Sequence, residues 1–430
     1  MEGVRRCAAS RRIPAAWFLC AGRARPYPHP GGAGWQAERR RRFASRSPRC
    51  ERALHPVEEP GPAETIERRS GMAERYRVAI LGLGKIARAH MRGYLAPENV
   101  ARVAIVAGAD ISAEAREQFR AEYGVERLYE DSRELLEKER PDIVSICTWP
   151  PLHPEMVEAA AAVGARGILC EKPMAVDLAG ADRMVTAAER AGAVLVIGHQ
   201  RRLLPRYTEA RRLIEEGMIG ELVQVSVMCH GDLLSDGTHS VDLMRYLAGD
   251  APAVWVIGNF DLRPREVPNT GPQSFGFQEW ERTRTRYGHH VETGAVGLVH
   301  FSTGVRGLVE TGICARPGYQ RALVYGTEGW IEISGDRPVA EEPPLRARLR
   351  DRAEWYVPEL PTVNAFAREI ALLIEAIERE TRHPLDASSA RAGHEIIMAI
   401  FESARRRARI DLPLTVTESP LEALVAAGAG

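Results

Sequence analysis

The sequence contains almost no lysine. Lys85, Lys138 and Lys172 are the only lysines among 58 basic residues, and arginine fills the other basic positions. Arginine supplies the same charge but does not release its proton near neutrality, whereas a partly buried lysine can. A lysine kept in such a chain is therefore a candidate for a role that arginine cannot fill. Lys85 and Lys138 are explained equally well as ordinary surface residues.

Charge imbalance, long apolar runs and paired cysteines are missing as well. The formal net charge is zero, which argues against a nucleic-acid partner. No run reaches the roughly 18 apolar residues needed to span a bilayer, so we expect no membrane segment. The seven cysteines form no CxxC pair, and Cys147, Cys170, Cys229 and Cys314 lie within apolar runs, where a free thiol acts as a small hydrophobic group. This usage predicts a reducing, cytoplasmic location.

Residues 1–71 differ from the rest of the chain. They hold four consecutive arginines, scattered proline and glycine, and no sustained period of a strand or a helix. A twin-arginine export signal at Arg11 and Arg12 is disfavoured, because the apolar stretch that follows is short and contains Pro14. Recurring glutamate argues against an organelle transit peptide. We expect a disordered leader or an over-extended gene start, with the true start at Met72.

Strands and helices alternate from residue 77 onward. Apolar runs predict strands at 78–81, 103–109, 142–148, 167–170 and 194–197, with helices at 85–95, 112–123, 154–163 and 177–191. Ser112 is the expected N-cap of its helix. This alternation predicts a doubly wound parallel α/β sheet of the Rossmann type over residues 72–200.

The rhythm changes after about residue 205. Runs at 222–228, 254–260, 294–301, 305–312, 321–325 and 330–333 predict successive strands, interrupted by one helix at 239–247. This order predicts a second, α+β domain with a largely antiparallel sheet over residues 201–362. Amphipathic helices at 364–380 and 387–408 occupy residues 363–412, and 413–430 form a tail. Residues 263–290 are polar and contain proline and glycine, which favours a long loop or an insertion near the site.

A glycine-rich motif follows the first predicted strand and opens the first helix. The first glycine permits a tight turn, the second lets the backbone approach a pyrophosphate, and the helix N-terminus offers free N–H groups to phosphates. The motif predicts a dinucleotide-binding site formed by Gly82, Leu83, Gly84, Lys85 and Ile86.

Asp110 ends the second predicted strand. A carboxylate there accepts hydrogen bonds from both adenosine ribose hydroxyls and repels a 2′-phosphate, so we expect NAD, with NADP as the alternative. The other interpretation is that Asp110 caps the helix beginning near Ser112.

Two further segments leave strands at the edge where open parallel sheets bind ligands. Thr148, Trp149 and Pro150 follow one strand, and they form either a cofactor loop or a structural turn; His153 is either a ligand contact or a helix cap. Glu171, Lys172 and Pro173 follow the next strand.

A lysine at this edge hydrogen-bonds a substrate hydroxyl and eases its deprotonation during hydride transfer. In this interpretation Glu171 orients the Lys172 ammonium. The other interpretation of the pair is a salt bridge at a strand end.

The glycine loop, the Thr-x-Pro segment with its histidine, and Glu-Lys-Pro resemble, in this order and spacing, the glucose–fructose oxidoreductase / inositol dehydrogenase / rhizopine-catabolism (Gfo/Idh/MocA) family. Residues 198–202 and Pro205 resemble that family's junction between domains, and residues 236–243 resemble the start of its catalytic helix. The resemblance covers about residues 75–410. It implies a Rossmann domain, an open-faced sheet, terminal helices that pack back on the first domain, and homodimers or homotetramers through the sheet.

The resemblance also implies roles for single residues. Lys172 matches the family's catalytic lysine, and His239 matches its catalytic histidine, which accepts the alcohol proton. Many sugar-oxidising members carry an aspartate four residues before the histidine, where this chain has Ser235. Asp236, one residue later, points about 100° away on a helix start. Asp236 therefore either takes part in catalysis or caps the helix while Ser235 faces the substrate. Arg202 either reaches the cofactor or substrate or forms a structural ion pair.

These expectations describe an NAD(P)-dependent oxidoreductase that transfers hydride between nicotinamide and a sugar, a polyol or a related hydroxyl compound. An NAD-dependent glycosidase of the same family is one alternative. A non-catalytic NAD(P)-sensing regulator is another, although its lysine and histidine would be expected to be lost. No metal site is predicted, because His289 and His290 lack partners at ligand spacing and are expected in a flexible loop.

Overall fold

The first half of the chain is built on apolar runs that are long enough for a strand and too short for a helix. The computed structural model describes residues 75–263, 283–312, 320–335 and 342–428. Val78, Ala79, Ile80 and Leu81 are all fully buried, as in a parallel sheet covered on both faces. The strands of this sheet are β1 (Tyr76–Leu81), β2 (Val103–Ala109), β3 (Leu128–Tyr129), β4 (Ile143–Ile146), β5 (Gly167–Cys170) and β6 (Val194–Ile197).

In the described part of the chain these six strands are all parallel and lie in the order β3-β2-β1-β4-β5-β6. The winding reverses between β1 and β4, and ligands bind in such sheets beyond the carboxyl ends of the strands at the reversal. The predicted doubly wound sheet is confirmed. Its connections contain α1 (Lys85–Tyr94), α2 (Ala113–Tyr123), α3 (Ser132–Glu139), η1 (Pro150–Leu152), α4 (His153–Ala162) and α5 (Leu178–Ala191).

The second sheet is largely antiparallel, as predicted. Within the described residues its eight strands lie in the order β15-β14-β13-β7-β12-β11-β8-β16, and β7 and β12 form its parallel pair. Its strands are β7 (Leu222–Cys229), β8 (Ala253–Asp261), β11 (Gly294–Phe301), β12 (Arg306–Glu310), β13 (Gln320–Gly326), β14 (Trp330–Ile333), β15 (Leu345–Arg348) and β16 (Ile410–Asp411).

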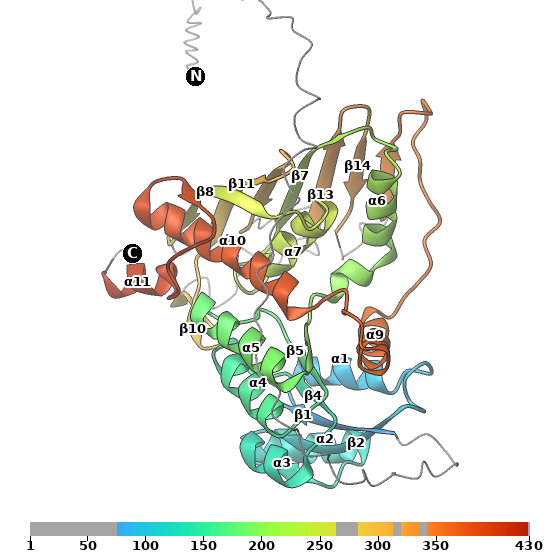
Figure 1. Ribbon diagram of the computed structural model, residues 1–430, viewed down its shortest axis with the longest axis vertical. Coiled ribbons are helices and arrows are strands. Elements are labelled where there is room, and N and C mark those ends of the chain that lie inside the picture. The colour runs from blue at the N-terminus through green and yellow to red at the C-terminus, as the bar shows by residue number, and fades with distance from the viewer. Residues whose placement is uncertain (1–74, 264–282, 313–319, 336–341, 429–430) are drawn as a thin grey trace, which may run out of the picture. The chain divides into compact units, whose positions relative to one another are not determined.

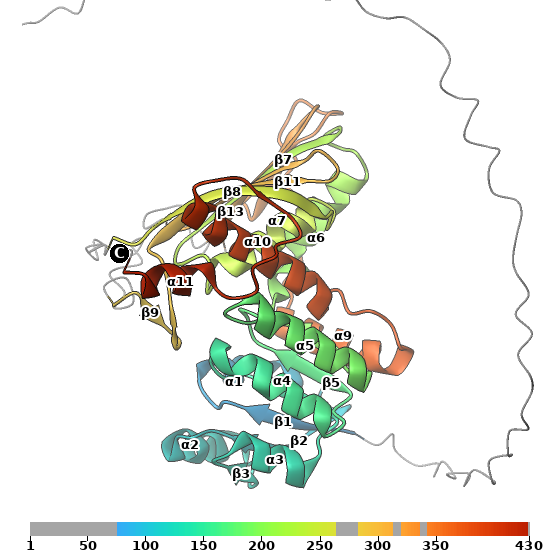
Figure 2. The same ribbon diagram turned by 60° about the vertical axis from the view of Figure 1, so that its left-hand side comes forward.

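Side chains alternate across this second sheet between a covered and an open face. Val256 and Val299, which pair across β8 and β11, are fully buried. Helices α6 (Pro205–Glu215), α7 (Gly237–Leu247) and α10 (Ala387–Arg406) lie against this face (Figure 2). A Cβ at Gly258 would lie 2.7 Å from Ile400 Cγ2, so glycine in β8 allows α10 to pack close to the sheet.

The closing helices connect the two halves. Helix α9 (Ala365–Arg379) packs against α1, and its apolar side chains share a core with β1. Figure 1 shows α9 and α1 on one side of the first sheet and α4 and α5 on the other. Helix α10 contacts α5 as well as the second sheet, and α11 (Pro420–Ala426) follows it. The domain limits predicted at residues 71, 200, 362 and 412 stay predictions.

Several elements lie where no helix or strand was expected. Helix α6 begins with Pro205, and α11 lies within the predicted tail. The expected flexible loop at 289–290 is wrong: β10 (His289–His290) pairs with β9 (Thr285–Arg286) in a hairpin, because cross-strand hydrogen bonds and burial fix His289. The 3-10 helix η2 (Gln200–Leu203) follows β6.

Three predictions fall outside the described residues: the leader at 1–71, the greater part of the loop at 263–290, and the setting of Cys314. Among the described cysteines, Cys147, Cys170 and Cys229 are free and buried. The cytoplasmic location stays a prediction. No helix in the described ranges combines the length and apolarity that crossing a bilayer requires.

Replacing Leu373 tests the packing of α9 on the first sheet. Leu373 is fully buried in the core that contains Val78 and Ile80, so Leu373→Ala is expected to lower the free energy of unfolding by about 2–5 kcal/mol. Leu372→Ala, at the half-buried next position of the same helix, is the matched control and should lower it less. Equal losses in urea titrations of the two variants would contradict this packing.

Candidate active site

The glycine loop has the backbone that its motif predicts. Gly82 has φ +86°, and a Cβ there would lie 2.8 Å from the Cys147 carbonyl carbon, so no other residue fits. Gly84 is exposed, and nothing lies within 4 Å of the place that a Cβ would take. It precedes α1, whose N-terminus has no side-chain cap. The free N–H groups of this first turn fit a pyrophosphate. Leu83 is buried, while Lys85 is exposed and Ile86 half-buried.

Asp110 supports the glycine loop from the end of β2. Its Oδ2 accepts a hydrogen bond of 2.8 Å from the Leu83 N–H, and its Oδ1 accepts one of 2.8 Å from the Ser112 N–H. Ser112 itself caps α2 by accepting from the Ala115 N–H, as predicted. The interpretation of Asp110 as the cap of this helix is therefore wrong. Each carboxylate oxygen keeps acceptor capacity for a ribose hydroxyl.

The loop after β4 presents one side chain to solvent and buries another. Trp149 is 60% exposed, whereas the Thr148 hydroxyl is buried and has no hydrogen-bond partner. Pro150 is buried at the start of η1. An unpartnered buried hydroxyl at the ligand-facing edge of a parallel sheet fits a bound ligand.

His153 ties this loop to the next one. It is fully buried, with Nδ1 3.0 Å from the Pro173 carbonyl oxygen and Nε2 3.0 Å from the Thr148 carbonyl oxygen. Burial lowers the pKa of His153, so its neutral ring donates to one of these oxygens and only contacts the other. Its backbone ends η1 and Leu152 is the N-cap of α4, while both of its ring nitrogens face backbone carbonyls.

The side chains of Glu171 and Lys172 point in different directions. Glu171 is buried, with Oε1 2.9 Å from His90 Nε2 and Oε2 accepting from the Lys172 backbone N–H. Lys172 extends to the second sheet's side of the site, where its Nζ donates to the Ser235 carbonyl at 2.9 Å. Glu171 thus holds the backbone of Lys172, whereas the ammonium that we expected it to orient donates to Ser235 instead.

The charge of Glu171 is maintained inside the protein. Burial alone would raise its pKa, but His90 and Lys172 outweigh that effect and lower it. Burial also disfavours the charged His90 ring, yet Cys147 and Glu171 raise the pKa of His90 above its ordinary value. His90 and Glu171 therefore form a buried ion pair.

The start of α7 brings Ser235 and His239 to Lys172. The Ser235 hydroxyl and His239 Nδ1 are both buried without hydrogen-bond partners. Burial, with further effects of Arg201 and Lys172, lowers the pKa of His239 well below its ordinary value. The ring is therefore neutral near neutral pH and can accept a proton.

Asp236 forms an ion pair and no helix cap. It occupies the N-cap position of α7, but its side chain makes no cap hydrogen bond. Its Oδ2 lies 2.5 Å from Arg286 Nη1, which is also 2.8 Å from Asp232 Oδ2. The expectation that Asp236 caps this helix is wrong, because the guanidinium of the β9–β10 hairpin holds the carboxylate.

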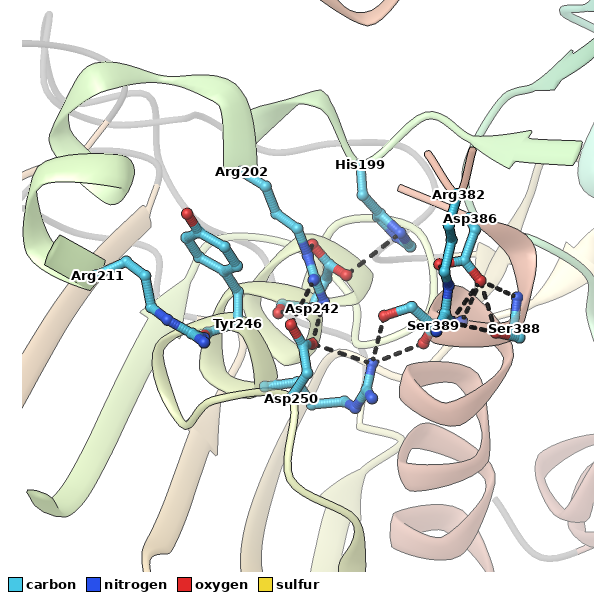
Figure 3. A network of polar contacts seen from close by, with 11 residues as sticks. His199, Arg202, Arg211, Asp242, Tyr246, Asp250, Arg382, Asp386, Ser388 and Ser389 are labelled. Carbon is cyan, nitrogen blue, oxygen red and sulfur yellow. Dashed lines mark hydrogen bonds and ion pairs between the residues drawn. The ribbon is translucent and has the colours of Figure 1, made fainter. Parts of the chain in front are cut away.

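Arg202 forms the structural ion pair that we gave as one of its alternatives. Its Nε lies 2.7 Å from Asp242 Oδ2, and its Nη2 lies 3.0 Å from Asp250 Oδ1. Figure 3 shows the guanidinium between these two carboxylates with the Tyr246 ring beside it. Arg202 is 4% exposed and joins η2 to α7, so its side chain is engaged within the protein.

Four residues near these groups were not found from the sequence. Arg286 reaches Asp232 and Asp236 from the hairpin, and His90 reaches Glu171 from α1. Glu292 is fully buried, and burial together with Asp232 raises its pKa to about 8; its Oε2 has no hydrogen-bond partner. His289 Nε2 is also buried without one. The polar composition of residues 263–290 was the available signal for Arg286 and His289, and no signal in the sequence pointed to His90 or Glu292. In the described ranges no group of His, Cys, Asp and Glu is placed to hold a metal ion.

Comparison with protein families identifies both sheets. Residues 76–199 match the oxidoreductase family with an NAD-binding Rossmann fold, and residues 230–332 match the GFO/IDH/MocA C-terminal domain. The chain is therefore an NAD-binding oxidoreductase. It belongs to the GFO/IDH/MocA family, which confirms the resemblance seen in the motifs.

Named relatives are dehydrogenases. Myo-inositol 2-dehydrogenase of Thermotoga maritima is 26% identical over 270 residues, 59% of this chain and 74% of that protein. Inositol 2-dehydrogenase of Rhizobium meliloti is 25% identical over 327 residues, 70% and 89% of the two chains. The structure of a levoglucosan dehydrogenase in complex with NADH shares the fold, with a TM-score of 0.67 and 21% identity over 79% of this chain and 100% of that one.

Gly84→Ala tests the glycine loop without disturbing the fold. An added methyl group meets no protein atom within 4 Å but stands where the backbone approaches the pyrophosphate, so the Kd for NAD should rise by about tenfold or more. Gly393→Ala, in helix α10 with ordinary contacts at 3.8 Å, is the control and should bind NAD as the unmodified chain does. Calorimetric titration measures both. An unchanged Kd for Gly84→Ala would place the pyrophosphate elsewhere.

Proposed function

We propose that this enzyme transfers hydride between NAD and a hydroxyl-bearing carbon of a sugar, a polyol or a related compound, with Lys172 and His239 handling the proton. One observation carries the proposal. The Lys172 ammonium donates a hydrogen bond to the carbonyl of Ser235, which lies 63 residues further along the chain, just before the helix that holds His239. The inositol dehydrogenases among the relatives support the substrate class.

The residues would divide the chemistry as follows. Bound NAD supplies a carbon that accepts the hydride. The Lys172 ammonium donates a hydrogen bond to the substrate hydroxyl and stabilises the negative charge that develops on its oxygen. The neutral His239 ring, whose Nδ1 has no hydrogen-bond partner among the described residues, accepts the hydroxyl proton. The unpartnered Ser235 hydroxyl is free to bond a neighbouring substrate hydroxyl.

The cofactor would lie along the edge of the first sheet. Gly82, Gly84 and the first turn of α1 would hold the pyrophosphate, and Asp110 would accept hydrogen bonds from the ribose. The negative charge of Asp110 disfavours a 2′-phosphate, so we infer NAD rather than NADP. The Thr148 loop would pass close to the nicotinamide side.

Asp236 receives no proton-transfer role in this proposal. Its carboxylate is neutralised by Arg286 and packs over Gly231. A carboxylate held in this way forms part of the wall of the site. Many sugar-oxidising members of the family carry an aspartate one residue earlier, and Ser235 takes that place near the substrate in this chain.

Lys172→Ala tests the proposal directly. A panel of polyols and sugars is first screened for NAD reduction, and the variant is then assayed with the best substrate. The loss of the ammonium should lower kcat by about 10²–10⁴-fold, while NAD binding remains measurable. Lys138→Ala, whose side chain makes an exposed pair with Glu134, is the control and should keep full activity.

Other results of the same assays would point away from this function. Near-normal turnover by Lys172→Ala would remove the lysine from the mechanism. Cleavage of a nitrophenyl glycoside without accumulation of NADH would mark an NAD-dependent glycosidase. NAD binding without turnover on any substrate would favour a sensing regulator.

We further propose that the open face of the second sheet joins copies of the chain into a homodimer or homotetramer. Ile257, Leu298 and Leu308 lie side by side across β8, β11 and β12, and Leu323 continues this row beyond Ser226. Ile257 is 46% exposed. An exposed apolar row of this kind favours contact with another protein surface.

Leu298→Lys places a charge in the middle of this row without touching the covered face of the sheet. We expect it to shift the chain toward monomers in sedimentation-velocity experiments, because a charge buried at an interface must be paired. Val100→Lys, on the loop between α1 and β2 and 41% exposed, is the matched control and should leave the assembly unchanged. An assembly that survives Leu298→Lys would use another surface.

A further inference from the structure

A chain of buried polar groups lies beneath the edge of the first sheet. His90 Nε2 is 2.9 Å from Glu171 Oε1, and His90 Nδ1 is 3.2 Å from Ser145 Oγ. The same Ser145 oxygen lies 2.8 Å from the Tyr94 hydroxyl. His90, Tyr94 and Ser145 are fully buried, and Glu171 is 5% exposed. The four groups come from α1, β4 and the end of β5.

Stability alone does not account for a charged pair at this place. A buried ion pair is often replaced by apolar side chains of similar volume with no loss of stability. An apolar side chain lies beside the pair, since the His90 ring packs against the Phe366 ring of α9 with centroids 5.7 Å apart. The arrangement therefore points to a role that requires a hydrogen bond in a defined direction.

The geometry shows what the pair connects. His90 lies on α1, the helix whose first turn follows the glycine loop. Glu171 Oε1 faces His90, and Glu171 Oε2 accepts from the Lys172 backbone N–H at 3.1 Å. One carboxylate thus links the glycine-loop helix to the backbone of the residue whose ammonium reaches Ser235.

We propose that His90 is a positioning residue that, through Glu171, fixes the backbone of Lys172 relative to the cofactor-binding helix α1. The proposal rests on the function proposed above for Lys172. His90 acts on Lys172 through the Glu171 carboxylate, while its other ring nitrogen contacts Ser145.

The other titratable groups around the pair are neutral. The buried carboxyl of Glu369, on α9, has no hydrogen-bond partner for either oxygen, and burial with the nearby Glu171 raises its pKa well above the ordinary value. Burial raises the pKa of the thiols of Cys147 and Cys170 and lowers the pKa of His199. Tyr94 is protonated, because burial raises the pKa of its hydroxyl. Among these neighbours, His90 and Lys172 are the cations that act on Glu171.

Removal of His90 has a defined electrostatic consequence. A buried carboxylate that loses its cation takes up a proton. Lys172 then loses the anionic carboxylate that accepts its backbone N–H. The environment of Lys172 should therefore change in His90→Leu, and Glu171→Gln should change it in the same way.

The scarcity of lysine makes this measurement possible. Reductive ¹³C-methylation labels Lys85, Lys138 and Lys172 and the chain's amino terminus, and Lys85→Arg and Lys138→Arg assign the lysine NMR signals. In the full-length chain without substrate, we expect the chemical shift of the Lys172 signal to move in His90→Leu, to move in the same direction in Glu171→Gln, and to move no further in the double variant. His394→Leu is the control, since His394 is 3% exposed and its Nε2 contacts a backbone oxygen, that of Asp177. A Lys172 signal that stays in place in His90→Leu would overturn the proposal.

Turnover separates positioning from mere charge balance. With the substrate found by the screen, His90→Leu should lower kcat by about 10–100-fold, with the Kd for NAD little changed. The double variant His90→Leu/Glu171→Gln, which buries no unpaired charge, should regain thermal stability but not kcat. If kcat returns together with stability, His90 acts only as a counterion and the proposal fails.

Two features of these experiments keep their outcomes distinct. If His90→Leu does not fold, Glu171→Gln alone and His90→Gln, which keeps one donor toward Glu171, give the same comparison. The NMR comparison needs no substrate, so it tests the link between His90 and Lys172 even if the screen finds none and the proposed function fails.

Discussion

The proposed site depends on one of the hydrogen bonds between the two halves of the chain, which runs from the Lys172 ammonium to the Ser235 carbonyl. Lys172 follows a strand of the parallel sheet, and Ser235 precedes the helix that covers the second sheet. The parallel sheet fixes where its strands end, and the antiparallel sheet fixes where α7 begins. In the function that we propose, the substrate hydroxyl meets the ammonium beside this carbonyl.

The charges in and around the site are balanced by nearby residues, and some of the surrounding carboxyl groups are neutral. Asp232 and Asp236 share Arg286, and Asp242 is paired with Arg202. Burial raises the pKa of Glu292 to about 8 and that of Glu369 well above its ordinary range. With these charges cancelled or absent, Glu171 is the anion that remains beside Lys172 among the acidic residues described above.

The sequence predicts what depends on neighbours along the chain. Local patterns predict the strand before Glu171, the turn at Gly82 and the Ser112 cap. Together with the glycine loop, they were enough to predict that Lys172 lies at the ligand-facing edge of the sheet. Contacts between distant segments could not be predicted from the sequence. The pairing of Asp236 with Arg286 and of His90 with Glu171 depends on how helices and a hairpin pack on the sheets, and a chemical pattern in the chain does not encode which of several carboxylates an arginine will meet.

The order in which the chain is synthesised gives the position of α9 and α11 a consequence of its own. One face of the first sheet is covered by Ile370 and Leu373 of α9, and His290 of the β9–β10 hairpin is held by Glu422 of α11. Proteins are made from the N-terminus onward, and domains begin to fold as they emerge. The glycine loop is among the first described segments to leave the ribosome, yet its sheet stays partly uncovered until α9 follows. The C-terminal part of the chain therefore completes the cover of the first sheet.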